Sequence, residues 1–188
     1  MQLSALEISE AIERRSEAAG PTESAGAGRR IAEVRAPGEI RAENARLDEE
    51  LLAEAEAFDP AKLTRAPEGE WSAAQVLAHL GEFPRFFAGE LRRWHDDPSA
   101  VIGRTIEHPV RLAAVEAPAD LLDELVAGMR SAFTELAAAL ELIGRDDADA
   151  KTENVKYGPE PLSAFFDRYV IGHKAAHLDQ LRALAALP

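Results

Sequence analysis

Apolar residues recur at helical spacing in four long segments of the chain, and charged residues fill most of the positions between them. The first segment spans residues 40–58, and its apolar stripe consists of Leu47, Leu51, Ala55 and Phe58. Residues spaced by three or four positions lie on one face of a helix, so this stripe predicts a helix that buries one side.

A second helix is predicted to begin at Trp71-Ser72, with Ser72 as its N-cap, and to continue to about Trp94. Pro84 lies inside this segment. Proline has no N–H to donate to the carbonyl of Leu80, and its ring crowds that carbonyl. The sequence therefore predicts a kink between these two residues.

Two further helices are predicted over residues 118–143 and 161–187, separated by a polar loop that extends through Pro159. Residues 96–117 show no helical period and are predicted to be a long connection, with a short extended piece within 103–111. No segment gives a convincing strand pattern. The chain is therefore predicted to be all-α, a four-helix bundle in which sites form between facing helices.

The chain before this bundle has a different character. A weak apolar stripe over residues 4–19 predicts a short amphipathic helix, and residues 20–28 are rich in Gly, Ser and Pro, as flexible linkers are. We therefore divide the chain into an N-terminal extension and linker, residues 1–38, and a four-helix bundle domain, residues 39–188.

Charge and composition exclude several classes of partner and site. The formal net charge of −13 would repel nucleic acid and anionic membranes. Neither a span of roughly 20 apolar residues nor a secretion signal is present, so we expect a cytoplasmic protein. The absence of cysteine excludes disulfides and thiolate ligands. Any metal site must therefore use His, Asp or Glu.

The histidines suggest such a site. His173 and His177 are four residues apart on the last predicted helix, where both imidazoles lie on one face and can share an ion. His79 lies on the apolar face of the second helix and offers a third ligand. His95, in a polar helix end, is expected to be solvated, and His108 to lie in a loop. We predict one divalent metal ion held by His79, His173 and His177.

Two familiar metal sites do not match these residues. A zincin requires Glu directly after the first histidine of the pair, where this chain has Lys174. A di-iron bundle requires Glu three residues before a ligating histidine, and none of the five histidines has an acidic residue there. Three imidazoles leave at least one coordination position open, as in catalytic zinc sites.

The segment W71-S-A-A-Q-V-L-A-H79-L, followed by H173-K-A-A-H177-L-D-Q-L181, resembles the DinB/YfiT-like superfamily of four-helix metalloproteins. By this resemblance, His79, His173 and His177 take the places of the family's three ligands. The resemblance implies zinc or nickel as the metal and a homodimer. It also implies thiol-dependent transferase or isomerase chemistry with mycothiol, bacillithiol or glutathione.

Three functional hypotheses follow. The first is a metal-dependent thiol S-transferase acting on a small electrophile, because a metal lowers the pKa of a bound thiol. The second is a hydrolase that uses metal-activated water, in which Glu82 or Tyr169 could reach the site. The third is a non-catalytic, metal-stabilised stress or binding protein. The sequence identifies no catalytic residue, substrate or thiol partner.

Overall fold

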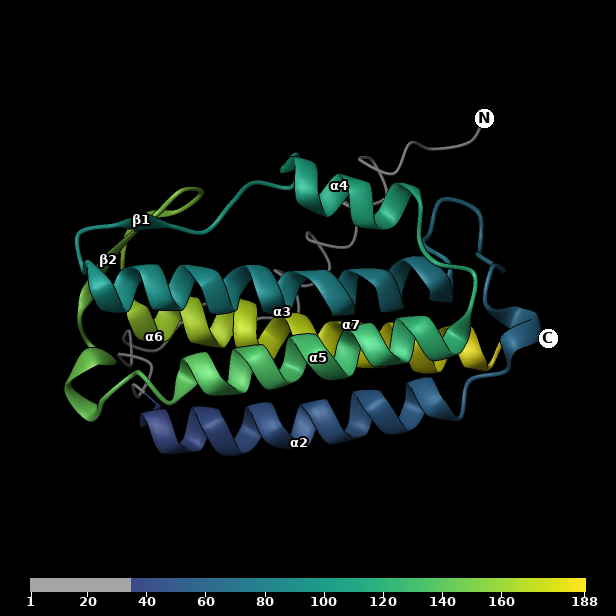
Figure 1. The fold of residues 1–188 in the computed structure, drawn as a ribbon, viewed down its shortest axis with the longest axis horizontal. Coiled ribbons are helices and arrows are strands. Elements are labelled where there is room, and N and C mark those ends of the chain that lie inside the picture. Colours follow the sequence, from purple (N-terminus) through teal and green to yellow (C-terminus); the bar gives the residue numbers. More distant parts are fainter. Residues whose placement is uncertain (1–34) are drawn as a thin grey trace, which may run out of the picture.

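The computed structural model describes residues 35–188, which form a mostly helical fold. The predicted helix at 4–19 and linker at 20–28 lie outside the described residues. No helix in the described part is long and apolar enough to cross a membrane. The long helical segments run side by side in Figure 1 and are α2 (Pro37–Glu56), α3 (Ala73–Asp96), α5 (Leu122–Leu140) and a last segment made of α6 (Leu162–Phe165), η3 (Phe166–Gly172) and α7 (His173–Ala185).

The apolar stripe predicted for the first helix is confirmed. Leu47, Leu51 and Ala55 are buried on α2, and Phe58 is buried just beyond its end. These side chains belong to one core cluster that also includes buried residues of α3, α5 and α7. Burial of this stripe fixes which face of α2 meets the other helices.

The predicted start of α3 is also confirmed. The Ser72 hydroxyl accepts a hydrogen bond from the Gln75 backbone N–H at 3.4 Å, and the Gln75 side chain accepts one from the Ser72 N–H at 3.0 Å. This reciprocal pair is a capping box, which satisfies two amide groups that the first turn leaves without helical partners. It fixes the start of α3 at Ala73, less than two turns before His79.

Helix α3 continues through Pro84 as one helix, and the kink expected there stays a prediction. Near this point α3 packs closely on α5. A Cβ atom placed on Gly81 would lie 3.4 Å from the carbonyl carbon of Gly128. A Cβ atom at this position would therefore touch the α5 backbone directly, which shows how closely the two helices pack.

The last predicted helix contains a change of helical type. Residues Phe166–Gly172 form a π-helix, and α7 begins directly after it at His173. A Cβ atom on Gly172 would lie 3.0 Å from the carbonyl oxygen of Asp167, closer than Cβ atoms normally approach. π-helical turns are rare and often lie at functional sites. Here the π-helix ends at Gly172, the residue directly before His173.

The connections contain more structure than the sequence predicted. Residues 96–117 include a strand and a helix, and the expected loop before residue 161 includes a hairpin. The extended piece lies just before the range 103–111 in which it was expected. The elements are η1 (Pro60–Lys62), β1 (Val101–Ile102), α4 (Pro109–Glu116), η2 (Arg145–Asp147), β2 (Lys151–Asn154) and β3 (Gly158–Pro161).

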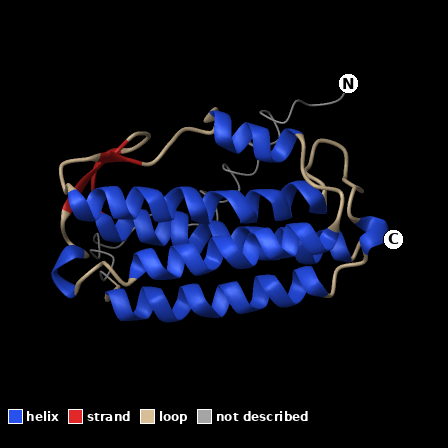
Figure 2. Ribbon diagram, viewed as in Figure 1, coloured by secondary structure: helices blue, strands red, loops and turns tan. Residues whose placement is uncertain are grey.

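The strands form a small sheet at one end of the helices, drawn in red in Figure 2, in which β1 pairs parallel with β2 and β2 antiparallel with β3. The sequence did not predict this sheet, because no segment has a convincing strand pattern. The hairpin depends on polar contacts that hydrophobic periodicity does not reveal. The Asn154 side chain accepts a hydrogen bond from the Lys156 N–H at 2.8 Å, and Gly158 supplies a positive φ of 71°.

Helix α5 begins at Leu122, four residues later than predicted, because residues 118–121 do not join it.

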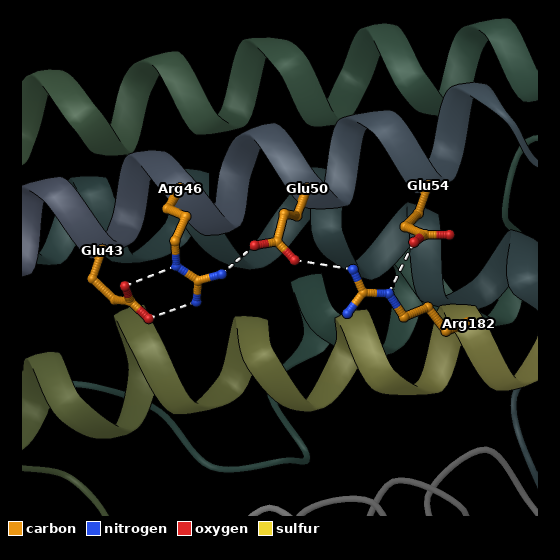
Figure 3. A network of polar contacts seen from close by, with 5 residues as sticks. All are labelled: Glu43, Arg46, Glu50, Glu54 and Arg182. Carbon is orange, nitrogen blue, oxygen red and sulfur yellow. Dashed lines mark hydrogen bonds and ion pairs between the residues drawn. The ribbon is translucent and has the colours of Figure 1, made fainter.

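Exposed ion pairs link α2 and α7 (Figure 3). Arg182 donates to Glu54 at 2.8 Å and to Glu50 at 3.0 Å, and Glu50 also accepts from Arg46. Exposed pairs of this kind contribute little individually, so the buried apolar stripes dominate the packing of α2 on α7.

Candidate metal centre

The structure brings the three predicted histidines together. The Nε2 atom of His173 lies 3.0 Å from Nε2 of His79 and 3.1 Å from Nε2 of His177. One nitrogen from each residue lies within 4.8 Å of the other two. Nitrogens of a tetrahedral site with metal–nitrogen bonds of about 2.0–2.1 Å lie roughly 3.3 Å apart. The three side chains therefore already face a common point at nearly the spacing of a metal site.

Aromatic side chains hold the imidazoles in place. Trp71 is fully buried; its ring stacks on His177 at 6.1 Å between centroids and meets His79 edge-on at 5.2 Å. The ring of Phe83 lies 4.5 Å from that of His173. Trp71, at the predicted start of the second helix, thus contacts the site. Rigid packing of this kind limits the rotamers open to each imidazole.

A hydrogen bond fixes the tautomer of His177. Its Nδ1 lies 2.9 Å from Oε1 of Gln180, one turn further along α7. An amide oxygen can only accept, so Nδ1 carries the proton and Nε2 keeps its lone pair. That lone pair faces the other two histidines. Ligating histidines usually donate their second ring N–H to an oxygen in this way.

The second ring nitrogen of His79, Nδ1, points towards a carboxylate. Nδ1 of His79 is buried without a hydrogen-bond partner among the described residues, and Oε2 of Glu82 lies 3.6 Å from it. Arg104 holds that carboxylate in place with both guanidinium nitrogens, the longer contact being 2.7 Å. A small shift of His79 would therefore bring its Nδ1–H into hydrogen-bond range of Glu82.

Burial keeps the three imidazoles neutral. It lowers the pKa of His177 to about 4, and the Gln180 hydrogen bond opposes this only in part. Burial also lowers the pKa of His79 and His173 well below the usual value, and the neighbouring imidazoles and Arg111 lower it further. Metal ligation requires neutral imidazole, so the site is in its ligating form at neutral pH.

A cavity of about 20 Å³ lies against the cluster. His79 and His173 line it together with two buried arginines, Arg104 from the segment after β1 and Arg111 from α4. The other lining residues are Phe83, Phe87, Thr105 and Tyr169. Phe83 and Phe87 belong to the core cluster and also form part of the cavity wall. None of the described lining residues carries a carboxylate.

The two arginines were not found from the sequence. They lie in the segment that was predicted to be an irregular connection, where nothing in the local composition distinguishes them from surface charges. One signal was present: Arg111 and Val115 are four residues apart after Pro109, a residue favoured in a first helical turn, and both are buried on α4. This spacing is typical of one face of a short helix. It does not predict that the helix lies next to the histidines.

The remaining candidates lie apart from the cluster. His95 is exposed near the end of α3, as predicted. His108 is the residue before α4, and its ring packs 5.0 Å from that of Phe86. Lys174, at the position of the zincin glutamate, is fully buried and donates to Asp48 on α2. That lysine therefore joins two helices and does not line the cavity.

The donor set fits a divalent ion. Three neutral imidazoles converge, the second nitrogen of His177 has an acceptor in place, and that of His79 faces a carboxylate. Imidazole nitrogen suits zinc, nickel and other borderline metals, whereas calcium and magnesium prefer oxygen ligands. Without a metal, Nε2 of His173 is the shared partner of Nε2 of both His79 and His177, and one ring nitrogen cannot fully satisfy two buried neighbours, which is a costly arrangement.

Comparisons with known proteins agree with this architecture. The family model of the DinB superfamily matches residues 43–181, a range that includes all three histidines. No curated protein sequence matches the chain. The fold is similar to that of a structural genomics target from Streptococcus pneumoniae, with a TM-score of 0.61 over 79% of this chain and 90% of that chain, at 13% sequence identity. At that identity the likeness concerns the fold alone.

Proposed function

The chain belongs to the DinB superfamily, and on this premise we propose that it binds one divalent metal ion through His79, His173 and His177. The observation that carries the proposal is the convergence of three Nε2 atoms, with contacts of 3.0 and 3.1 Å, in a buried site. Zinc and nickel are the candidate metals. We assign the long helical segments to a four-helix bundle that holds the ligands from two facing segments.

Residues around the ligands prepare the site. Gln180 keeps Nε2 of His177 unprotonated, and Glu82, held by Arg104, is placed to accept a hydrogen bond from His79. Such partners orient the imidazoles and raise their basicity, and their loss typically costs about 10- to 100-fold in metal affinity. We assign both Gln180 and Glu82 as positioning residues.

The chemistry we propose is metal-dependent S-transfer to a small electrophile. When bound, the metal would supply Lewis acidity that lowers the pKa of a thiol or water at the open coordination position. The cavity next to His79 and His173 gives that position access to a ligand. Hydrolysis would benefit from a general base. Of the two candidates, Glu82 is engaged by Arg104, and Tyr169 lines the cavity but offers a phenol in place of a carboxylate. A metal-bound thiol ionises more readily than metal-bound water and depends less on such a base, which is why we place S-transfer first.

Metal binding is tested by competition titration. The full-length chain would be titrated with Zn²⁺ and with Ni²⁺ against a chromophoric chelator, alongside His173→Ala and, as a matched control, His95→Ala. His95 is exposed and lies outside the cluster. We expect one tight site in the wild type and in His95→Ala, and its loss in His173→Ala. Equal affinity of all three proteins for both metals would overturn the proposal.

The proposed chemistry has a separate test. The metal-loaded chain would be assayed for loss of glutathione, mycothiol or bacillithiol in the presence of a small electrophile. Turnover that requires metal and is abolished in His177→Ala would support S-transfer. Turnover of a model ester without thiol would favour the hydrolase. Stoichiometric metal with neither activity would favour a non-catalytic metal-stabilised protein. The homodimer belongs to the same proposal and is tested by sedimentation equilibrium.

A further inference from the structure

Lys174 is a charged residue at a core position of the last helix. Its side chain is fully buried, and it shares one stripe of α7 with Leu178 and Leu181, which are buried four and seven residues further on. Lysine is seldom fully buried, because removing its charge from water is costly. Its place in this apolar stripe therefore calls for an explanation.

Three helices meet at the Lys174 ammonium group. It donates to Oδ1 of Asn44 at 2.7 Å and to Oδ1 of Asp48, both on α2, and it lies 4.4 Å from the centroid of the Phe133 ring on α5. The Asn44 amide donates to the other Asp48 oxygen at 2.9 Å. Asn44 and Asp48 are themselves buried. These two residues and Lys174 form a buried polar network that joins α7 to α2.

Stability alone does not account for this polar network. Replacement of a buried ion pair by apolar side chains of similar size is often neutral or stabilising, because no charge then has to leave water. A buried polar contact can instead add specificity, since a charge that has partners in only one arrangement disfavours the others. Leucine side chains tolerate a small rotation of the helix that carries them, whereas the Lys174 ammonium group would lose its partners.

The arrangement that Lys174 specifies is the one that the metal centre needs. Lys174 directly follows His173 in the first turn of α7, and successive residues of an α-helix lie about 100° apart around its axis. His177 is only about 40° from His173 around the same axis. With Lys174 directed at α2, both imidazoles face α3, where the centroid of each ring lies 5.2 Å from that of His79.

We propose that Lys174 is a positioning residue for the metal centre. Its contacts to Asn44 and Asp48 fix the rotation of α7 about its axis and so direct His173 and His177 towards the third histidine. Lys174 does not line the cavity and acts only through the helix. This inference rests on the proposed function. It predicts that metal affinity follows the geometry of the polar network and not the stability of the fold.

Two changes to the polar network separate geometry from stability. The triple variant Asn44→Leu/Asp48→Leu/Lys174→Met removes the whole network and leaves none of its charges unpaired. Asp48→Asn keeps an oxygen that can accept from Lys174 but removes the compensating charge. Arg182→Met is the control, because Arg182 also joins α7 to α2, but through exposed ion pairs.

Each full-length chain is measured in three ways: urea unfolding of the metal-free protein, competition titration with Zn²⁺, and the visible spectrum of bound Co²⁺, which reports ligand geometry. We expect the triple variant to be as stable as the wild type, to bind Zn²⁺ at least about tenfold more weakly and to show an altered Co²⁺ spectrum. Asp48→Asn should be less stable than the wild type yet keep its Zn²⁺ affinity and Co²⁺ spectrum. Arg182→Met should match the wild type in all three measurements.

The outcomes separate the two proposals. Failure of the wild type to bind Zn²⁺ would overturn the metal centre and this inference with it. A triple variant with wild-type Zn²⁺ affinity or an unchanged Co²⁺ spectrum would overturn the positioning role alone, as would stability and affinity that fall in parallel in the variants. If the triple variant does not fold, Asp48→Asn decides: wild-type affinity at lower stability supports the role of Lys174, and a loss of about tenfold or more in affinity contradicts it.

Discussion

Nδ1 of His177 and Oε1 of Gln180 lie 2.9 Å apart on successive turns of α7, so Gln180 fixes which ring nitrogen of His177 can bind a metal. If this contact sets the tautomer, its removal should weaken metal binding without disturbing the fold. We expect Gln180→Leu to lower metal affinity by about 10- to 100-fold. Competition titration measures this, with Asp179→Ala as the exposed neighbouring control. Unchanged affinity in Gln180→Leu would remove Gln180 from the site.

The pair formed by Glu82 and Arg104 should matter for stability as well as for metal binding. Glu82→Gln removes the charge that compensates buried Arg104, and an unpaired buried charge costs about 3 kcal/mol in unfolding free energy. The matched control is Glu135→Gln, which breaks the exposed pair with Arg85 and should cost less than about 1 kcal/mol. Urea unfolding of metal-free protein compares them. Equal losses would contradict the structural role assigned to the buried pair.

Gly172 should be required for the π-helical segment. A Cβ atom there would approach the Asp167 carbonyl oxygen, so Gly172→Ala must shift the backbone directly before His173. We expect a lower melting temperature and weaker metal binding. Gly89→Ala is the control, because a Cβ at this exposed position on α3 meets nothing within 4 Å. Alanine in an open helical position should stabilise by about 0.5–1 kcal/mol. Identical behaviour of the two variants would contradict this account.

The stability of the metal-free protein should depend on pH through the histidine cluster. Burial lowers the pKa of His177 from 6.5 to about 4, so as pH falls below 6.5 the unfolded chain gains a proton that the folded chain does not. The contribution of His177 is complete above pH 6.5 and is lost as pH falls towards 4.

Between pH 6 and pH 5 this residue alone should lower the unfolding free energy by about 1 kcal/mol. His79 and His173, whose pKa values are also lowered, should add to the slope. Urea unfolding at pH 7, 6 and 5 measures it, and His177→Gln should show a smaller slope than the wild type. A wild-type slope no steeper than that of the variant would contradict the assignment of a buried, neutral imidazole.

Much of the scaffold could be predicted from the sequence because helical periodicity records burial directly. The stripe of Leu47, Leu51 and Ala55 predicted α2, and Ser72 marked the start of α3. The same periodicity placed His79 on an inward face. The spacing of His173 and His177 then predicted that the three imidazoles meet, as they do in the structure.

The rest depends on contacts between distant segments, which periodicity does not record. The sheet joins β1 to β2 across about fifty residues, and its hairpin depends on the Asn154 side chain and on Gly158. Arg104 and Arg111 become site residues only because α4 and the segment after β1 lie over the histidines. The π-helix before His173 could not be predicted from the spacing of apolar residues, because its turns contain more residues than those of the α-helix on which that spacing is based.

The most direct test of the account is elemental analysis of protein purified without a histidine tag and never exposed to chelator. We expect about one zinc or nickel ion per chain in the wild type and in His95→Ala, and a loss of that metal in His79→Ala and His177→Ala. Absence of stoichiometric metal from the wild type, or its retention in both cluster variants, would contradict the proposed three-histidine metal centre.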